Sequence, residues 1–416
     1  MKALIRTITP FIIIYALFVG CSGEQPPSEY VLPAGNWRVA VTLPGGELPF
    51  LMEISDTETG RMAAFVNGEE RVPVQDVSIS ADTVRLTLPT LNSRVEAVSN
   101  GSELDGTLTL TKRGGILQIM PFHAVLGETH RFFSEAETPA SINVDGRWEV
   151  LFVEDDGTET AAVGEFSQDG HVVKGTFLTP TGDYRFLAGQ VQDSVLYLSC
   201  FDGGHAFLFK AKLASDGRLH GDFWSGTKWH ERWSAVRNAD AALPDAYELT
   251  YIKDGYDGIE FAFPDVDGNI VSLDDERFQG KVVMLTIAGS WCPNCNDEAK
   301  FLAPFYKIKR EKGLEIIGLM YEHFKDFETS AKQVRRFRKK FGIEYELLVA
   351  GYSDKKDAAE TLPMLNHVLS YPTTIFIDKK GNVRKIHTGF TGPGTGAHFE
   401  KLTYEFNGFV DKLLAE

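Results

Sequence analysis

Two cysteines separated by two residues are the side chains of this chain best suited to carry chemistry. Cys292 and Cys295 lie in the segment Trp291-Cys292-Pro293-Asn294-Cys295, which follows an apolar run at 282–287 and opens a helical pattern. Two thiols at this spacing, where a strand meets a helix, can interconvert with a disulfide. The segment therefore predicts thiol–disulfide exchange.

The order of the residues in this segment suggests how the two thiols divide the work. A strand that ends near residue 287 would place Cys292 at the N-cap and Pro293 at the first helical position, which suits proline. Cys295 follows about one turn later on the same side of the helix. Unpaired N–H groups at a helix start favour a thiolate. We therefore expect Cys292 to be an exposed nucleophile and Cys295 to be the resolving thiol.

A Cys-x-x-Cys segment can also bind zinc, attach haem or form a structural disulfide. A zinc site needs a second pair of ligands, and the chain has no second Cys-x-x-Cys segment. Haem attachment needs a histidine directly after Cys295, where Asn296 stands. A structural disulfide is unusual where a strand meets a helix, but the sequence leaves it open. We expect no metal and no cofactor.

The elements that must position the cysteines alternate between strand and helix patterns over residues 259–416. This alternation predicts an α/β domain with a mixed, partly parallel sheet and helices on both faces. The expected strands are 282–287, 315–320, 346–349, 373–377 and 383–387, and the expected helices are 293–311, 327–341, 356–367 and 398–414.

The region before this domain has the short alternating runs of an all-β structure, and it is internally duplicated. Gly35-Asn36-Trp37-Arg38-Val39 recurs as Gly146-Arg147-Trp148-Glu149-Val150, and a second match follows at the same offset. We expect one β repeat over 30–135 and another over 143–238, which together form a barrel or a sandwich. A linker at 239–258 joins them to the last domain.

The N-terminus has the features of an export signal. Residues 1–20 combine a short basic start with an apolar stretch too short to span a membrane. Gly20 before Cys21 resembles the lipobox of bacterial lipoproteins, which implies a lipid-modified Cys21 followed by a tether over 21–29. An ordinary signal peptide and an uncleaved anchor are the alternatives. The resemblance places the soluble domains on the periplasmic side of the bacterial envelope, and Ser22 favours the outer membrane.

The last domain resembles the TlpA/ResA-like thiol–disulfide oxidoreductases, which have a thioredoxin fold. The resemblance covers residues 259–416 and depends on several segments that occur in the family's order. These are the first hairpin at 263–269, a core strand start at 280–283, the active-site segment 291–295, a proline segment at 371–378 and a second hairpin at 380–382.

The resemblance implies roles for the proline segment. Pro372 would follow a cis peptide bond and lie opposite Cys292. The backbone of Tyr371 would pair with a bound substrate peptide, with Thr373 and Trp291 as further substrate contacts.

The resemblance also assigns Glu298, three residues past Cys295, to tuning the thiols and moving protons. A solvated helix carboxylate is the competing interpretation. Thr286 stands where thioredoxins have a buried Asp and TlpA/ResA-like chains often have Asn. Because a hydroxyl cannot act as a carboxylate base, proton transfer to or from Cys295 would fall to Glu298 or to water.

Several other residues that could do chemistry have simpler interpretations. Cys200 lies in an apolar strand pattern and reads as a buried, inert thiol. His323, His387 and His398 read as surface or loop residues. The glycine-rich segment 389–396 lacks the Lys-Ser/Thr of a phosphate loop and is expected to pack beside the Cys-x-x-Cys segment.

The leading hypothesis is a lipid-anchored envelope protein that reduces substrate disulfides. Its partners would be an oxidised envelope protein, an upstream thiol donor and the membrane. The net charge of −16 argues against nucleic acid. One rival is a thiol peroxidase, although peroxiredoxins have Thr and Pro where Gly289 and Leu285 stand here. The other is a β region that binds a ligand or partner, with the redox domain as an accessory.

Overall fold

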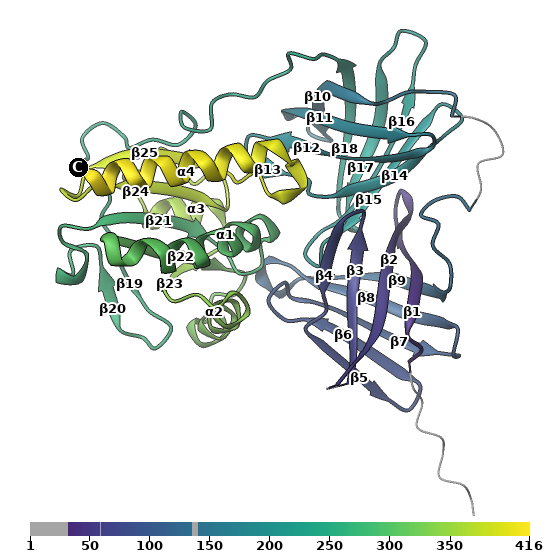
Figure 1. Cartoon of the computed structure of the whole chain (residues 1–416), viewed down its shortest axis with the longest axis horizontal. Coiled ribbons are helices and arrows are strands. Elements are labelled where there is room, and N and C mark those ends of the chain that lie inside the picture. Colours follow the sequence, from purple (N-terminus) through teal and green to yellow (C-terminus); the bar gives the residue numbers. More distant parts are fainter. Residues whose placement is uncertain (1–31, 59, 135–139) are drawn as a thin grey trace, which may run out of the picture.

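The computed structural model describes residues 32–416, except for 59 and 135–139. The chain forms two β units followed by an α/β unit (Figure 1). The three units lie against one another, and a stretch without strands or helices at 238–261 connects the second β unit to the α/β unit. None of the helices in the described part of the chain is long and apolar enough to cross a membrane.

The first β unit is a nine-stranded antiparallel sheet. Its strands pair in the order β4-β3-β2-β1-β9-β8-β7-β6-β5. Buried and exposed residues alternate along strands such as β7, as expected when one face of a sheet packs on a core. The strands are β1 (Gly35–Leu43), β2 (Gly46–Thr57), β3 (Gly60–Asn67), β4 (Glu70–Pro73), β5 (Asp76–Ser80), β6 (Thr83–Leu88), β7 (Ser93–Ser99), β8 (Glu103–Thr111) and β9 (Leu117–Leu126).

The second β unit is a similar nine-stranded antiparallel sheet, which confirms the predicted duplication. Its order is β11-β10-β18-β17-β16-β15-β14-β12-β13, and its first strand pairs with its last, β10 with β18, as β1 pairs with β9 in the first unit. Trp37 and Trp148 occupy equivalent buried positions, and each indole donates to the carbonyl four residues before it. The strands are β10 (Gly146–Glu154), β11 (Glu159–Asp169), β12 (Val172–Thr179), β13 (Gly182–Asp183), β14 (Leu187–Gln192), β15 (Val195–Phe201), β16 (Ala206–Leu213), β17 (Leu219–Ser225) and β18 (Trp229–Arg237).

The two repeats differ in closure. In the second unit β12 pairs with both β11 and β14, which closes an eight-stranded barrel. The first sheet has no such pairing and remains a half-barrel. The hairpin between β15 and β16 fills its open side, because Phe201 packs against Phe50 and Phe65 with ring centroids 5.0 and 5.1 Å apart. The two β units therefore share a core.

The α/β unit has the thioredoxin-like arrangement that the sequence predicts. Its five-stranded sheet has the order β23-β22-β21-β24-β25. Strands β23, β22 and β21 are parallel to one another, β24 is antiparallel to β21, and β25 is antiparallel to β24. Every residue of β21 and β24 is buried, so the helices cover both faces of the sheet. The strands are β19 (Ala262–Pro264), β20 (Ile270–Ser272), β21 (Val282–Ala288), β22 (Leu314–Glu322), β23 (Glu346–Tyr352), β24 (Thr373–Ile377) and β25 (Val383–Thr388), and the helices are α1 (Pro293–Lys309), α2 (Phe327–Phe341), α3 (Lys355–Thr361) and α4 (Ala397–Ala415).

One predicted helix is wrong in extent. The pattern at 356–367 predicted a helix of that length, but α3 ends at Thr361. Pro363 disfavours the helical conformation of the residue before it, and Leu362 has a non-helical backbone with φ −127° and ψ 64°. The apolar side chains after this point are buried in the core of the α/β unit without being helical.

Candidate functional site: a dithiol at the start of helix α1

The loop between β21 and α1 holds the dithiol and is fixed by the end of β22. Ser290 donates to both carboxylate oxygens of Glu322, from its backbone N–H at 2.9 Å and from its hydroxyl at 2.7 Å. The indole of Trp291 donates to the carbonyl of Tyr321 at 2.9 Å and stacks on His323, with centroids 4.2 Å apart. Three successive residues of β22 and the turn after it thus set the position of the loop that leads into Cys292.

Cys292 is the N-cap of α1, as the sequence predicts. Its sulfur accepts from the backbone N–H of Cys295 at 3.2 Å, and its thiol donates to the carbonyl of Tyr371 at 3.4 Å. The Tyr371–Pro372 peptide bond is cis. The expectation that Cys292 is exposed is wrong, because only 6% of its surface is accessible.

Cys295 lies deeper than Cys292, with 1% of its surface accessible. Burial raises the pKa of its thiol well above the ordinary value, and the neighbouring Cys292 adds to the rise. Both residues are free thiols in this structure. A buried thiol of this kind needs a nearby base before it can attack.

Glu298 is placed to be that base. Its side chain is buried on α1 and accepts hydrogen bonds from the hydroxyls of Thr374 and Thr286. Burial raises its pKa to about 7, and the two hydroxyls oppose that rise. Glu298 and Cys295 line the same small cavity. The interpretation of Glu298 as a solvated surface carboxylate is therefore wrong.

The residues expected to contact substrate occupy different environments. Trp291 and Tyr371 lie edge to face, with ring centroids 5.6 Å apart, beside the Cys292 sulfur. Thr373 is fully buried, and its hydroxyl donates to the carbonyl of Ser370 at 3.0 Å. Contacts of these residues with a substrate stay predictions. The glycine-rich segment does pack beside the dithiol, because Asn294 donates to the carbonyl of Phe390 at 3.2 Å.

Sequence reasoning missed Glu322 and misplaced two histidines. Glu322 is fully buried, and burial raises its pKa to about 7. His323 and His387 are also buried rather than on the surface, and burial lowers their pKa values to about 3 and about 4. The available signal was position in the sequence. Glu322 is the last residue of the parallel strand β22, and functional side chains gather at the carboxyl ends of parallel strands.

Of the two remaining cysteines, the structure describes one. Cys200 is completely buried, as predicted, and burial raises its pKa well above the ordinary value. Cys21, the predicted lipid attachment site, lies outside the described residues. Within 32–416, apart from the six undescribed positions, no cluster of His, Cys, Asp and Glu side chains could hold a metal ion.

Comparisons with known proteins point to the same chemistry. A model of the AhpC/TSA family matches residues 255–386. The thiol-disulfide oxidoreductase ResA of Geobacillus thermodenitrificans is 29% identical over 156 residues, which cover 37% of this chain and 81% of that protein. The thioredoxin-like protein YneN of Bacillus subtilis is 30% identical over 138 residues, which cover 33% of this chain and 73% of that protein.

Solved structures are similar over the same share of the chain. A thioredoxin-family thiol:disulfide interchange protein from Chlorobium tepidum is 19% identical, covers 39% of this chain and 99% of its own, and has a TM-score of 0.29. The site geometry and the two curated relatives agree on the family. This chain belongs to the thioredoxin-like thiol–disulfide oxidoreductases that include ResA, and its AhpC/TSA-matching domain is joined to a duplicated β region.

Proposed function

We propose that this protein reduces disulfide bonds in proteins of the bacterial envelope through Cys292 and Cys295, while a lipid on Cys21 holds it at the membrane. The observation that carries the reductase proposal is the pairing of an N-cap thiol, whose sulfur accepts the Cys295 N–H, with a buried second thiol beside Glu298. Such a pair supplies both thiols that complete exchange requires.

The exchange would proceed in two balanced steps. The Cys292 thiolate attacks one sulfur of the substrate disulfide, so that a mixed disulfide forms and the other substrate sulfur leaves as a thiolate that takes up a proton. Glu298 then accepts the proton of Cys295, whose sulfur attacks Cys292 and displaces the second substrate thiolate. Two electrons pass to the substrate, and a thiol donor must later reduce the Cys292–Cys295 disulfide.

The environment of Cys295 supports the reducing direction. Strongly oxidising dithiols owe their potential to a stabilised reduced form, in which a thiolate is favoured. The second thiol, Cys295, is not stabilised as a thiolate, because burial and the negative charge of its neighbours raise its pKa. We propose on this ground that electrons pass from the dithiol to the substrate.

Trapping the mixed disulfide tests the proposal. The Cys295→Ser variant cannot complete the second step, so it should accumulate covalent adducts through Cys292 when it is expressed in bacterial cells. Non-reducing gels and mass spectrometry of the adducts would identify the linkage. The Cys292→Ser/Cys295→Ser double variant is the control. Failure of the single variant to form any adduct above this control would count against the proposal.

Envelope localisation is proposed from the sequence of the N-terminus. Residues 1–20 have the pattern of an export signal, and Gly20-Cys21 resembles a lipobox. The described structure begins at Leu32, and β1 at Gly35, so a short segment would connect the lipid to the first β unit. The outer membrane is favoured by Ser22.

A thiol peroxidase is the second candidate, because the matching family model is that of AhpC/TSA. Peroxiredoxins have Thr three residues and Pro seven residues before the reactive cysteine. Gly289 and Leu285 stand at these positions, and the Leu285 side chain is buried in the core. We therefore expect no turnover of hydrogen peroxide by the reduced protein, measured as peroxide consumption with a thiol donor.

A further inference from the structure

The β region covers the dithiol. Both residues between the two cysteines are in contact with it. A Cβ atom on Gly204 would lie 2.9 Å from the ring of Pro293, and a Cβ atom on Gly182 would lie 2.4 Å from the amide nitrogen of Asn294. Asn294 also donates to the carbonyl of Asp183 at 3.5 Å. Strand β13 and the loop between β15 and β16 therefore lie directly on the active-site segment next to Cys292.

The cover extends to the segment that leads into the cis-proline. The hydroxyl of Ser370, next to Tyr371, donates to the carbonyl of Thr181 at 2.7 Å. On the other side of Pro372, a Cβ atom on Gly389 would lie 2.9 Å from the backbone of Thr181. The turn between β12 and β13 thus occupies the space beside Tyr371 and Pro372, where a bound substrate peptide is expected.

A single buried arginine links the three units at this boundary. Arg185 lies between β13 and β14, and its guanidinium pairs with Asp297 on α1 and with Glu70 on β4. It also lies 3.3 Å from the carboxylate of Asp202, in the same hairpin as Gly204. The pairing of Arg185 with Asp297 joins the barrel to the helix that carries both thiols, only two residues after Cys295.

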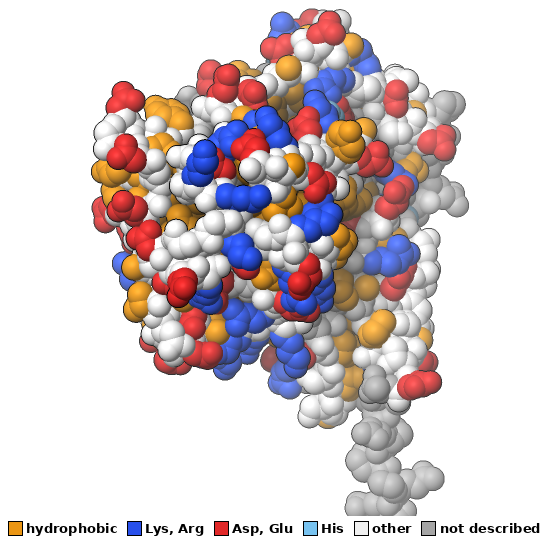
Figure 2. Space-filling view, turned by 60° about the vertical axis from the view of Figure 1, so that its left-hand side comes forward, with side chains coloured by type: hydrophobic (Ala, Val, Ile, Leu, Met, Phe, Trp, Pro, Cys, Tyr) orange, Lys and Arg blue, Asp and Glu red, His pale blue; other side chains and the backbone are white. Residues whose placement is uncertain are grey.

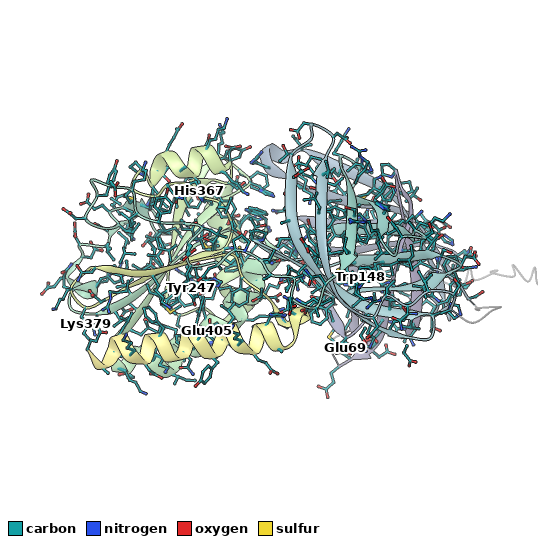
Figure 3. All side chains as sticks on the ribbon, turned by 90° about the horizontal axis from the view of Figure 1, so that it is seen from above. Glu69, Trp148, Tyr247, His367, Lys379 and Glu405 are labelled. Atoms are coloured by element: carbon teal, nitrogen blue, oxygen red, sulfur yellow. The ribbon has the colours of Figure 1, made fainter. Side chains whose placement is uncertain are left out.

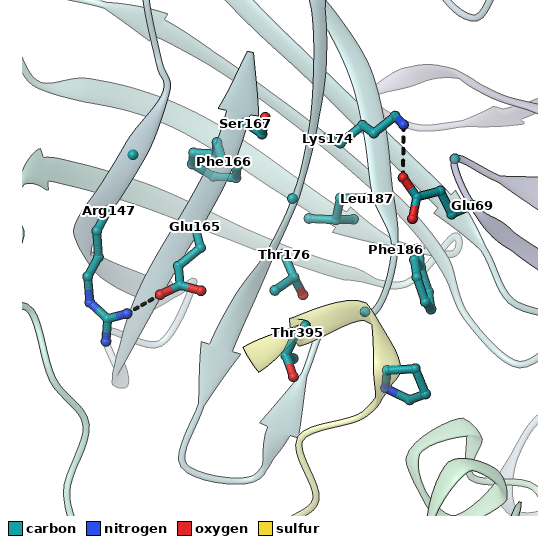
Figure 4. A pocket seen from close by; sticks show the side chains of 16 residues that line it. Glu69, Arg147, Glu165, Phe166, Ser167, Lys174, Thr176, Phe186, Leu187 and Thr395 are labelled. Carbon is teal, nitrogen blue, oxygen red and sulfur yellow. Dashed lines mark hydrogen bonds and ion pairs between the residues drawn. The ribbon is translucent and has the colours of Figure 1, made fainter. Parts of the chain in front are cut away.

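The boundary is polar rather than a shared core. Among the described residues, every hydrophobic cluster belongs either to the α/β unit or to the β region, whereas the two β units share one. The boundary also leaves a hollow of about 660 Å³ between the barrel and residues 393–396 (Figure 4). Its charged side chains are already paired, Arg147 with Glu165 and Lys174 with Glu69. Polar boundaries of this kind resemble transient interfaces, across which domains move.

The connection between the units has a short stretch that could act as a hinge. Ala241 packs against the barrel, and its carbonyl accepts from Arg147 at 2.8 Å. Tyr247 packs instead against His387 in the α/β unit, with ring centroids 4.9 Å apart, and lies on that side of the molecule in Figure 3, far from Trp148 of the barrel. Leu243 packs partly against the same cluster as Ala241, so residues 244–245 lie between the anchors, and both are exposed.

We propose that the β region is a removable cover over Cys292, latched by the Arg185–Asp297 ion pair. In the closed form that the structure shows, a protein disulfide cannot reach the Cys292 sulfur. In an open form, reached by bending at 244–245, the dithiol and the Tyr371–Pro372 edge become accessible together. This proposal rests on the proposed function, because it describes how the same dithiol is made available to its substrate.

Two independent variants of the full-length chain should open the cover. Gly204→Val places side-chain atoms against Pro293 from the barrel side, and Asp297→Asn removes the latch charge from the α/β side. The rate of Cys292 alkylation by iodoacetamide, followed by mass spectrometry of the reduced protein, should rise at least about tenfold in each. For Asp297→Asn this is the effect of losing one charge-assisted hydrogen bond on an opening equilibrium. For Gly204→Val the rise would come from the overlap of the added side chain with Pro293.

Matched controls lie on α4, away from the boundary. Gly408→Val adds a side chain where a Cβ atom meets open space, and Asp411→Asn removes the partner of Lys309. Both should alkylate at the parent rate. Equal rates in the parent, the two opening variants and the controls would overturn the cover.

Reduction of insulin disulfides by the same proteins separates the cover from the proposed function. Faster alkylation together with faster insulin reduction in the two opening variants supports both. Faster alkylation without insulin reduction in any variant supports the cover and contradicts the reductase. Insulin reduction at one rate in all variants, with unchanged alkylation, overturns the cover and leaves the reductase intact.

Discussion

Glu298 is the residue whose surroundings bear most directly on the second step of exchange. Cys295 is a buried thiol with a raised pKa, and Glu298 lines the same cavity with a pKa raised to about 7. A carboxylate with this pKa can accept a proton near neutral pH and return it later. Thr286 does not replace the missing acid of other thioredoxins but donates its hydroxyl to Glu298.

Replacing Glu298 should slow resolution of the mixed disulfide. Glu298→Gln keeps the size of the side chain but cannot accept the Cys295 proton, so release of the substrate should slow about 100-fold, a typical contribution of a general base. Quenched-flow measurement of the mixed disulfide would show its lifetime. An unchanged lifetime would mean that water serves as the base.

The same substitution should change how stability depends on pH. Below pH 4.5 the carboxyl is neutral in the folded and unfolded chain, and above about pH 7 it is ionised in both. Because the folded state disfavours the buried charge, its stability contribution is lost as the pH rises through this window. Glu298→Gln should remove a loss of about 3 kcal/mol between pH 4.5 and 8, measured by urea unfolding. An unchanged pH dependence would contradict the raised pKa.

At the scale of elements, the end of β22 fixes the loop that delivers Cys292 to the start of α1. Glu322 accepts two hydrogen bonds from Ser290, and Tyr321 and His323 hold Trp291. The helix start was predictable, because an apolar strand, a proline at the first helical position and two thiols are local signals. The contact with Glu322 was not, because it joins residues 32 positions apart.

The Ser290 hydroxyl should contribute measurably to stability. Ser290→Ala leaves one oxygen of the buried Glu322 carboxylate without its donor, which should lower the free energy of unfolding by about 1–3 kcal/mol. Ser78→Ala on the exposed face of β5 is the matched control and should change it by less than about 0.5 kcal/mol. Equal effects of the two substitutions in urea unfolding would show that the loop does not depend on this contact.

At the scale of the whole molecule, duplication and domain order follow from the sequence, but the arrangement of the units does not. Repeated segments such as those around Trp37 and Trp148 identify two copies, and in both copies the first strand pairs with the last. The contacts that cover the dithiol join residues 111 and 112 positions apart, as in Asn294 with Asp183 and Arg185 with Asp297. No local pattern marks such pairs, so Cys292 was expected to be exposed.

The surface of the whole molecule bears on its location. On the face shown in Figure 2, Lys and Arg side chains are interspersed with Asp and Glu. A face of mixed sign on a chain with a net charge of −16 gives little attraction to an anionic membrane. Membrane attachment would then depend on the lipid proposed for Cys21, since acyl chains contribute about 0.8 kcal/mol per buried methylene.

Removing the proposed lipid site should release the protein from the membrane. Cys21→Ala should move the chain from the membrane fraction to the soluble fraction of lysed cells, whereas Cys200→Ala, which removes a buried thiol elsewhere, should leave it with the membrane. Immunoblots of the two fractions would measure this. Membrane association of Cys21→Ala equal to that of the parent would contradict lipid attachment at this residue.

A redox titration of the dithiol tests the central claim most directly. The protein would be equilibrated in glutathione buffers of graded potential, quenched by alkylation and examined by mass spectrometry. We predict one two-electron transition, at a potential within the span of about −270 to −120 mV of related dithiols and toward its reducing end. In this transition Cys292 and Cys295 should lose their thiols together, while Cys200 stays reduced. If the two cysteines remained thiols at every potential, or were oxidised separately without a bond between them, the proposed exchange would be contradicted.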